Sequence, residues 1–128
     1  MKNIIISVDG PAGSGKGAIC KYVSKKWNLN HIDSGILYRR ISYLISKSNV
    51  DTDDKNKIRK LLSKIKHLSF RNNKKLKSNK ISNISSKIAV YDFVRKFINK
   101  TQKDYVEKNR NNKGFIVDGR DIGSVVFK

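Results

Sequence analysis

Cysteine and long apolar runs are scarce in this sequence, and each scarcity excludes a class of protein. Cys20 is the only cysteine among 128 residues, which excludes a disulfide framework and a cysteine-rich zinc site. Apolar runs such as Ile4, Ile5 and Ile6 are far shorter than the roughly 20 residues that a membrane span needs. No apolar segment followed by a small-residue cleavage site marks a secretory signal. We therefore expect a cytoplasmic protein with no membrane partner.

Acidic residues are also few: 10 stand against 29 lysines and arginines, which gives a formal net charge of +19. Most of the excess lies between residues 51 and 114, where it could form a nucleic-acid-binding face. Aromatic residues are not interleaved with the lysines as base-stacking platforms require. Lys, Asn and Ile, which share A/T-rich codons, make up 51 of the 128 residues. We therefore interpret the charge as compositional and expect no nucleic-acid partner, although a positive field attracts polyanionic substrates.

The apolar residues follow two alternating patterns. Short runs rich in β-branched residues predict buried parallel strands at residues 3–8, 29–32, 115–117 and 125–127. Between the strands, apolar residues recur at helical spacing. These stripes comprise Ile19, Cys20, Val23 and Trp27; Leu37, Ile41, Leu44 and Ile45; Ile58, Leu61, Leu62 and Ile65; Ile81, Ile84 and Ile88; and Val94, Phe97, Ile98 and Tyr105. The alternation predicts an α/β fold, with a parallel sheet flanked by helices in a single domain over residues 1–128.

Polar stretches connect the helices in the middle of the chain. Residues 51–53 (Asp-Thr-Asp) offer N-cap oxygens for the helix that follows. Residues 71–80 are predicted to form a loop or a short hairpin, because they contain almost no apolar side chain.

A glycine-rich segment joins the first predicted strand to the first predicted helix. It reads Gly10, Pro11, Ala12, Gly13, Ser14, Gly15 and Lys16, which satisfies G-x-x-x-x-G-K. The strand before it and the helix after it favour a phosphate-binding loop over an ordinary turn. Glycines let successive backbone N–H groups face an anion, the helix N-terminus adds partial positive charge, and the lysine reaches the β- and γ-phosphates.

Polar clusters follow three of the predicted strands, at Asp9, at residues 33–35 and at residues 118–121. Ligands bind beyond the carboxyl ends of strands in open parallel sheets, so we expect these clusters to converge. Asp118 ends an apolar strand as a Walker-B carboxylate does, which makes it a candidate Mg²⁺ ligand; alternatively, it caps the following turn. Gly17 and Ala18 follow the lysine, so the hydroxyl that commonly reaches Mg²⁺ is missing. The ion would then rest on phosphates, waters and Asp118.

Three segments of the chain resemble the signature segments of bacterial cytidylate kinases, in the same order. They read IIISVDGPAGSGKG, HIDSGILYRR and FIVDGRDIGSVVF. Between them, residues 85–89 and 94–95 resemble the helix of this family that faces the pyrimidine. The resemblance implies a P-loop nucleoside monophosphate kinase fold. It also implies transfer of a phosphoryl group from ATP, with Mg²⁺, to CMP or dCMP by a monomer.

The resemblance implies roles for individual residues as well. The ATP phosphates would be bound by the glycine-rich segment extended through Gly17 and Ala18. The catalytic residues would be Lys16, Arg39 and Arg120; Ser34, Arg39 and Arg120 would hold CMP near its phosphate, and Ser86, Arg95 and Asp121 would read the cytosine. An arginine suits a phosphate because it is always charged and can bind with two parallel hydrogen bonds.

Asp121 and Arg95 complement the Watson–Crick edge of cytosine. A carboxylate accepts a hydrogen bond from the exocyclic amine, and a guanidinium donates to the two neighbouring acceptors. The alternatives are surface roles. Arg39 could be an exposed helix residue, as we expect for Arg40, and Arg95 could pair with Asp92.

The chain also departs from the family pattern. Residues 68–80 are short and lysine-rich where the family inserts a small β-domain, so we expect a reduced nucleoside-monophosphate-binding insertion around residues 50–95. The sequence ends one strand after the Asp-Gly-Arg-Asp segment, so we expect an N-terminal portion that lacks the lid and the last strand and helix. The alternative is a nucleotide-binding or basic RNA-binding module without turnover. His31 and His67 show no partner pattern and are given no role.

Overall fold

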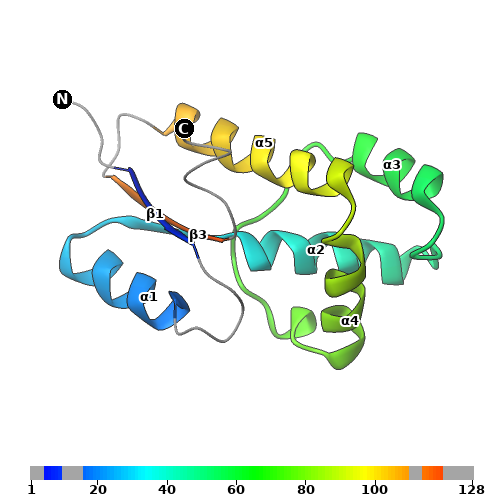
Figure 1. Ribbon diagram of the computed structural model, residues 1–128, viewed down its shortest axis with the longest axis horizontal. Coiled ribbons are helices and arrows are strands. Elements are labelled where there is room, and N and C mark those ends of the chain that lie inside the picture. Colours follow the sequence, from blue (N-terminus) through cyan, green and yellow to red (C-terminus); the bar gives the residue numbers. More distant parts are fainter. Residues whose placement is uncertain (1–4, 10–15, 110–113, 120–128) are drawn as a thin grey trace. The chain divides into compact units, whose positions relative to one another are not determined.

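The computed structural model describes residues 5–9, 16–109 and 114–119 (Figure 1). The elements are β1 (Ile5–Asp9), α1 (Lys16–Lys26), β2 (Asn30–Asp33), α2 (Ser34–Lys47), α3 (Lys55–Ser63), the 3₁₀ helix η1 (Lys74–Leu76), α4 (Asn79–Ile88), α5 (Asp92–Lys108) and β3 (Phe115–Gly119). They form two compact units, one of Met1–Ser34 and Asn99–Lys128 and the other of Gly35–Ile98. The strand predicted at residues 125–127 lies outside the described residues. None of the described helices is long and apolar enough to cross a membrane.

The first unit contains a parallel sheet with the strand order β1-β3-β2 (Figure 1). Ile5 pairs with Phe115 at one end of the β1–β3 ladder, and Asp33 pairs with Asp118 at the far end of the β2–β3 ladder. Parallel strands cannot be joined by a tight turn, and α1 is the connection between β1 and β2. The predicted α/β fold with a parallel sheet flanked by helices is confirmed. The described strands begin and end within two residues of the predicted bounds.

Different helices cover the two faces of this sheet, because successive residues of a strand point to opposite faces. Ile116 is buried in a cluster with Cys20 of α1 and Leu29, so α1 covers the face that Ile116 presents. Phe115 presents to the other face. There its ring meets the ring of Tyr105 of α5 edge-on, with 6.1 Å between the centroids.

Only part of the stripe predicted for α1 packs on the sheet. Cys20 is fully buried, whereas Ile19 is 56% exposed and Trp27 is 66% exposed. Trp27 directly follows the end of α1 at Lys26, and Lys26 lies over its ring, with 5.8 Å from Nζ to the centroid. The prediction that Ile19 and Trp27 share the packed face is therefore wrong.

The second unit is a group of helices around its own core. The buried side chains of this core are Leu37, Ile41, Ile45, Ile58, Leu62, Leu68, Ile88, Val94 and Ile98. Most of them belong to the predicted stripes, because apolar residues three or four positions apart share one face of a helix. A side-chain contact also joins α2 to α4, where the Ser42 and Ser85 hydroxyl oxygens lie 2.8 Å apart. The predicted insertion around residues 50–95 falls within this unit.

Local hydrogen bonds set where these helices begin. The N-cap of α3 is Asp54, whose carboxylate accepts from the Lys57 N–H at 3.1 Å, so the cap predicted at residues 51–53 is wrong. Asp51 instead accepts from the Asp53 N–H and shapes the preceding turn. Ser78 caps α4 in the same way. Residues 71–80 contain irregular backbone, η1 and the start of α4, so the loop prediction is correct only between these helices and the hairpin alternative is wrong.

Candidate nucleotide-binding site

The carboxyl ends of the three strands lie level with one another in the first unit. Asp9 pairs in register with Gly119, and Asp118 pairs with Asp33. The predicted convergence of the polar clusters is therefore confirmed for the residues that the structure describes. Asp118 is 2% exposed, so a carboxylate is held at the end of the central strand with almost no access to water.

Asp118 faces the first turn of α1. A Cβ atom built on Gly17 would lie 3.9 Å from Asp118 Oδ2, which is ordinary van der Waals contact. The carboxylate of Asp118 therefore lies next to the start of the helix, at the glycine that follows Lys16. Mg²⁺ is commonly held in nucleotide sites by one or two carboxylates together with substrate phosphates, and Asp118 fits that requirement as one hard oxygen donor.

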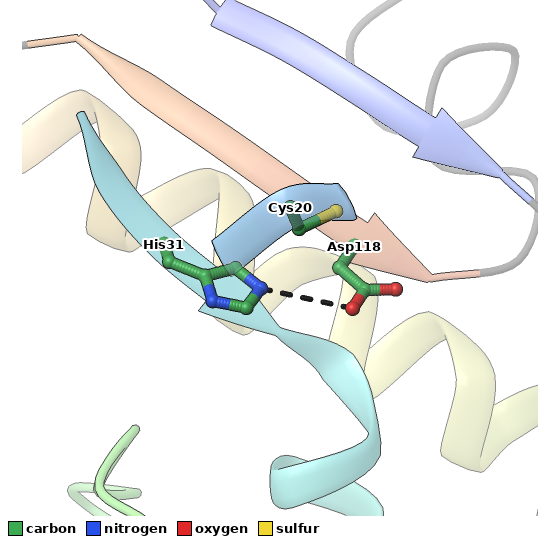
Figure 2. A group of neighbouring side chains, drawn as sticks. All are labelled: Cys20, His31 and Asp118. Atoms are coloured by element: carbon green, nitrogen blue, oxygen red, sulfur yellow. Dashed lines mark ion pairs between the residues drawn. The ribbon is translucent and has the colours of Figure 1, made fainter. Parts of the chain in front are cut away.

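His31 and Cys20 also lie beside Asp118. Figure 2 shows the three side chains converging from β2, α1 and the end of β3. His31 Nε2 is 3.6 Å from Asp118 Oδ2, and the His31 side chain is 25% exposed. The sequence shows no partner pattern for His31, and the structure places it beside Asp118. The signal was its position two residues before Asp33, which places His31 on the same strand face as Asp33.

The remaining predicted residues of the first unit are partly described. Ser34 is 7% exposed and begins α2 directly after β2. Lys16 begins α1, and Gly17 and Ala18 are exposed in its first turn. The predicted residues that lie outside the described part of the chain are Gly10, Pro11, Ala12, Gly13, Ser14, Gly15, Arg120 and Asp121.

Three predicted substrate residues belong to the second unit. Arg39 is half-buried on α2, Arg95 is exposed on α5, and Ser86 is exposed on α4. The Ser86 hydroxyl donates to the Ser82 carbonyl of its own helix at 3.2 Å. Their proposed substrate contacts stay predictions.

Two expectations about the neighbours of these residues can be checked. Arg40 is half-buried rather than exposed, and its Nη2 donates to the Arg71 carbonyl, which corrects the expectation of a solvent-exposed side chain. Asp92 pairs with Lys96, with 3.0 Å between the carboxylate oxygen and Nζ. Both side chains of that pair are largely exposed, so the pair adds little to stability.

A parallel sheet whose first strand leads through a G-x-x-x-x-G-K segment into a helix defines a P-loop protein. The family model of cytidylate kinase matches residues 6–128, and the chain belongs to that family. The resemblance seen in the three segments is thereby confirmed.

Individual relatives agree with the family assignment. The cytidylate kinase of Fusobacterium nucleatum is 39% identical over 137 residues, which cover 99% of this chain and 61% of the relative. The cytidylate kinase of Clostridioides difficile is 35% identical with the same coverage. A bifunctional pantoate ligase/cytidylate kinase of Prochlorococcus marinus is 37% identical over 138 residues, 96% of this chain and 26% of that protein. The chain thus spans about three fifths of the length of the first two relatives.

Proposed function

We propose that the protein transfers the γ-phosphoryl group of ATP to CMP or dCMP and so forms ADP and CDP or dCDP. The main support for this proposal is the buried Asp118, which lies beside Gly17 at the start of α1, directly after the G-x-x-x-x-G-K segment. The chain that contains this arrangement belongs to the cytidylate kinase family. In this reaction an oxygen of the CMP phosphate attacks the γ-phosphorus, and the bond to the β-phosphate oxygen breaks. Both reactants are small molecules, and we propose a cytoplasmic monomer.

The phosphate groups are held by cations and backbone N–H groups in this proposal. Residues 10–15 supply the N–H groups, and Lys16, Gly17 and Ala18 form the helix N-terminus that follows. Lys16 places its charge at the β- and γ-phosphates. Arg39 and Arg120 bind the CMP phosphate and the transferred group, with Ser34 donating a hydroxyl nearby. Positioned cations contribute most of the rate in phosphoryl transfer, because the chemistry demands little else of the protein.

A bound Mg²⁺ would supply positive charge that offsets the negative charge developing on the phosphates. Asp118 is the residue that would hold it. The Asp118 carboxylate is already fixed by burial at the strand end, so little ordering of the side chain is needed on binding.

The cytosine base is read by hydrogen bonds in this proposal. Asp121 accepts from the exocyclic amine, Arg95 donates to the ring nitrogen and the carbonyl, and Ser86 adds a hydroxyl. Uracil carries a carbonyl in place of the amine, so Asp121 would face an acceptor and lose its partner. A site built on such bonds rejects the wrong base because its own polar groups are left unpaired.

Replacement of Lys16 tests the proposal. We expect Lys16→Ala to lower CDP formation from ATP and CMP by at least about 100-fold, because the proposal assigns to Lys16 the charge at the β- and γ-phosphates. Lys21→Ala is the matched control: Lys21 is an exposed lysine on the same helix, and its loss should leave the rate within twofold of the parent. CDP is measured by chromatography and ADP by a coupled assay. Turnover of Lys16→Ala within threefold of the parent, or no CMP-dependent ADP release by the parent, would contradict the proposal.

A further inference from the structure

Three metal-ligating side chains from three different elements meet beside the end of β3. Cys20 of α1 is fully buried, His31 lies on β2, and Asp118 ends the apolar run of β3 (Figure 2). One donor atom from each, a sulfur, a nitrogen and an oxygen, lies within 4.8 Å of the other two. We propose that Cys20, His31 and Asp118 bind a zinc-class divalent cation.

The spacing of the donors suits such an ion. Zinc bonds of about 2.3 Å to sulfur and about 2.0–2.2 Å to nitrogen or oxygen, at tetrahedral angles, place the donors about 3.3–3.6 Å apart. His31 Nε2 and Asp118 Oδ2 are 3.6 Å apart, so these two donors already have the required separation. The 4.8 Å limit for the group means that the thiol of Cys20 needs to approach by no more than about 1.5 Å.

His31 provides the clearest sign of a ligand site. Its Nε2 atom is shielded from solvent and makes no hydrogen bond within the described residues. The 3.6 Å to the carboxylate is longer than a hydrogen bond, although a buried polar atom normally has such a partner. A metal ion between Nε2 and Oδ2 would give the ring nitrogen of His31 the partner that it otherwise lacks among the described residues.

The donor set selects the class of cation. A thiolate and an imidazole favour Zn²⁺ and similar transition metals, whereas Mg²⁺ and Ca²⁺ take oxygen ligands almost exclusively. Three protein ligands leave the fourth tetrahedral position to water or to a phosphate oxygen. A cysteine alone in this place would be only a small buried packing residue; the nitrogen and oxygen donors beside it distinguish the group from ordinary core packing.

This site has a consequence for the reaction, and that consequence rests on the proposed function. Asp118 is also the carboxylate that we propose for Mg²⁺. A zinc-class ion held by all three residues would occupy Asp118 and block its use by Mg²⁺. We therefore expect zinc to inhibit CDP formation, and the inhibition should weaken as Mg²⁺ is raised.

Cobalt absorption tests the binding directly and without any activity. The full chain, reduced with a phosphine, is titrated with Co²⁺ at neutral pH. A thiolate-to-cobalt charge-transfer band in the near ultraviolet can come only from Cys20, because the sequence contains no other cysteine. We expect the band to saturate at one Co²⁺ per chain and to disappear when Zn²⁺ is added. Absence of the band, or binding of Co²⁺ without it, would overturn the proposal.

Variants then test the other two ligands. Loss of an outer-shell partner alone costs about 10- to 100-fold in metal affinity, so His31→Leu and Asp118→Asn should each weaken Co²⁺ binding at least tenfold. His67→Leu is the matched control, because His67 is exposed and lies in the other unit. Circular dichroism shows whether each variant is folded. A folded His31→Leu chain that binds Co²⁺ as tightly as the parent would remove His31 from the site.

The kinetic consequence is measured separately. Zn²⁺ should lower the rate of the parent relative to its own zinc-free rate, and His31→Leu should require at least tenfold more Zn²⁺ for the same fractional loss. If the chain forms the cobalt band but makes no CDP, the metal site stands and the proposed function fails. If it makes CDP but forms no band, the function stands and the metal site fails.

Discussion

The hydrogen bond between Ser42 and Ser85 supports a prediction about how α4 is held against α2. Ser42 is fully buried, and its hydroxyl donates to the Tyr38 carbonyl at 2.7 Å. The same oxygen lies 2.8 Å from the Ser85 hydroxyl oxygen. A serine hydroxyl has a single hydrogen, and that of Ser42 is used on Tyr38. Ser85 must therefore be the donor and Ser42 the acceptor in the contact between the two helices.

Because Ser85 is the donor, Ser85→Ala and Ser42→Ala should lower the unfolding free energy by different amounts. Ser85→Ala removes a donor and leaves Ser42 bonded to Tyr38, so it should cost about 0.5–1.5 kcal/mol, as one net hydrogen bond does. Ser42→Ala removes the acceptor and leaves a half-buried Ser85 hydroxyl without this partner, so it should cost about 1–3 kcal/mol. Replacing both residues leaves no unpaired hydroxyl. We expect the double variant to cost about 1 kcal/mol less than the sum of the two single costs.

Urea unfolding of the parent, the two single variants and the double variant measures this coupling. Ser86→Ala is the matched control, because its exposed hydroxyl donates only within α4, and it should change the unfolding free energy by less than about 0.5 kcal/mol. If the costs of the two single variants sum to the cost of the double variant within about 0.3 kcal/mol, the assigned hydrogen bond is refuted. The contact between Ser42 and Ser85 also fixes the orientation of Ser86, a proposed cytosine contact. Ser85 faces α2, and the next residue of a helix lies about 100° further round its axis. Ser86 therefore lies on the exposed side of α4, where the proposal requires it to contact the base.

Three further predictions concern single side chains. Asp54→Ala removes the N-cap of α3 and should lower the unfolding free energy by about 1 kcal/mol, whereas Asp53→Ala should leave the melting temperature nearly unchanged. Ile88→Ala empties a fully buried position and should cost about 2–5 kcal/mol in urea unfolding; Val90→Ala, at a position 74% exposed, should cost less than about 0.5 kcal/mol. Asp121→Ala should lower kcat/KM for CMP far more than for UMP, and an unchanged CMP/UMP ratio would remove Asp121 from base recognition.

The secondary structure was predictable because burial leaves a periodic trace in the sequence. The strand around Ile116 is buried on both faces and reads as a continuous apolar run. The helices of the second unit bury one stripe each, so residues such as Ile58 and Leu62 recur at the helical period. Trp27 shows where this reasoning fails. Its spacing continues the period of α1, yet its side chain is 66% exposed, because spacing alone does not show which residues of a stripe are covered by the sheet.

The candidate site was only partly predictable, because some of its contacts depend on distant elements. Asp118 could be recognised from its position after an apolar strand, since the carboxyl ends of parallel strands meet at one edge. His31 could not be assigned a partner, because its neighbour is set by the pairing of β2 with β3 across more than 80 residues of chain. The approach of Cys20 depends further on how α1 packs over that sheet. The local sequence pattern places His31 on the strand face of Asp33, but it does not show which residues of β3 and α1 come to lie beside it.

The surroundings of Asp118 connect the proposed reaction to the proposed metal site. Gly17 follows the lysine where other P-loops commonly supply a Ser or Thr hydroxyl to Mg²⁺, and Ala18 offers no hydroxyl either, so the Mg²⁺ proposed here depends on Asp118 more than on any other described side chain. Gly17 lies beside that carboxylate at the start of α1, and His31 Nε2 lies 3.6 Å from Asp118 Oδ2. A protein with a second magnesium ligand could lose one carboxylate to a competing ion and still position its nucleotide. In this protein a zinc ion would occupy Asp118, the main carboxylate proposed for Mg²⁺. Ala18→Thr adds a hydroxyl that could bind Mg²⁺, so we expect this variant to need more zinc than the parent for half inhibition of CDP formation.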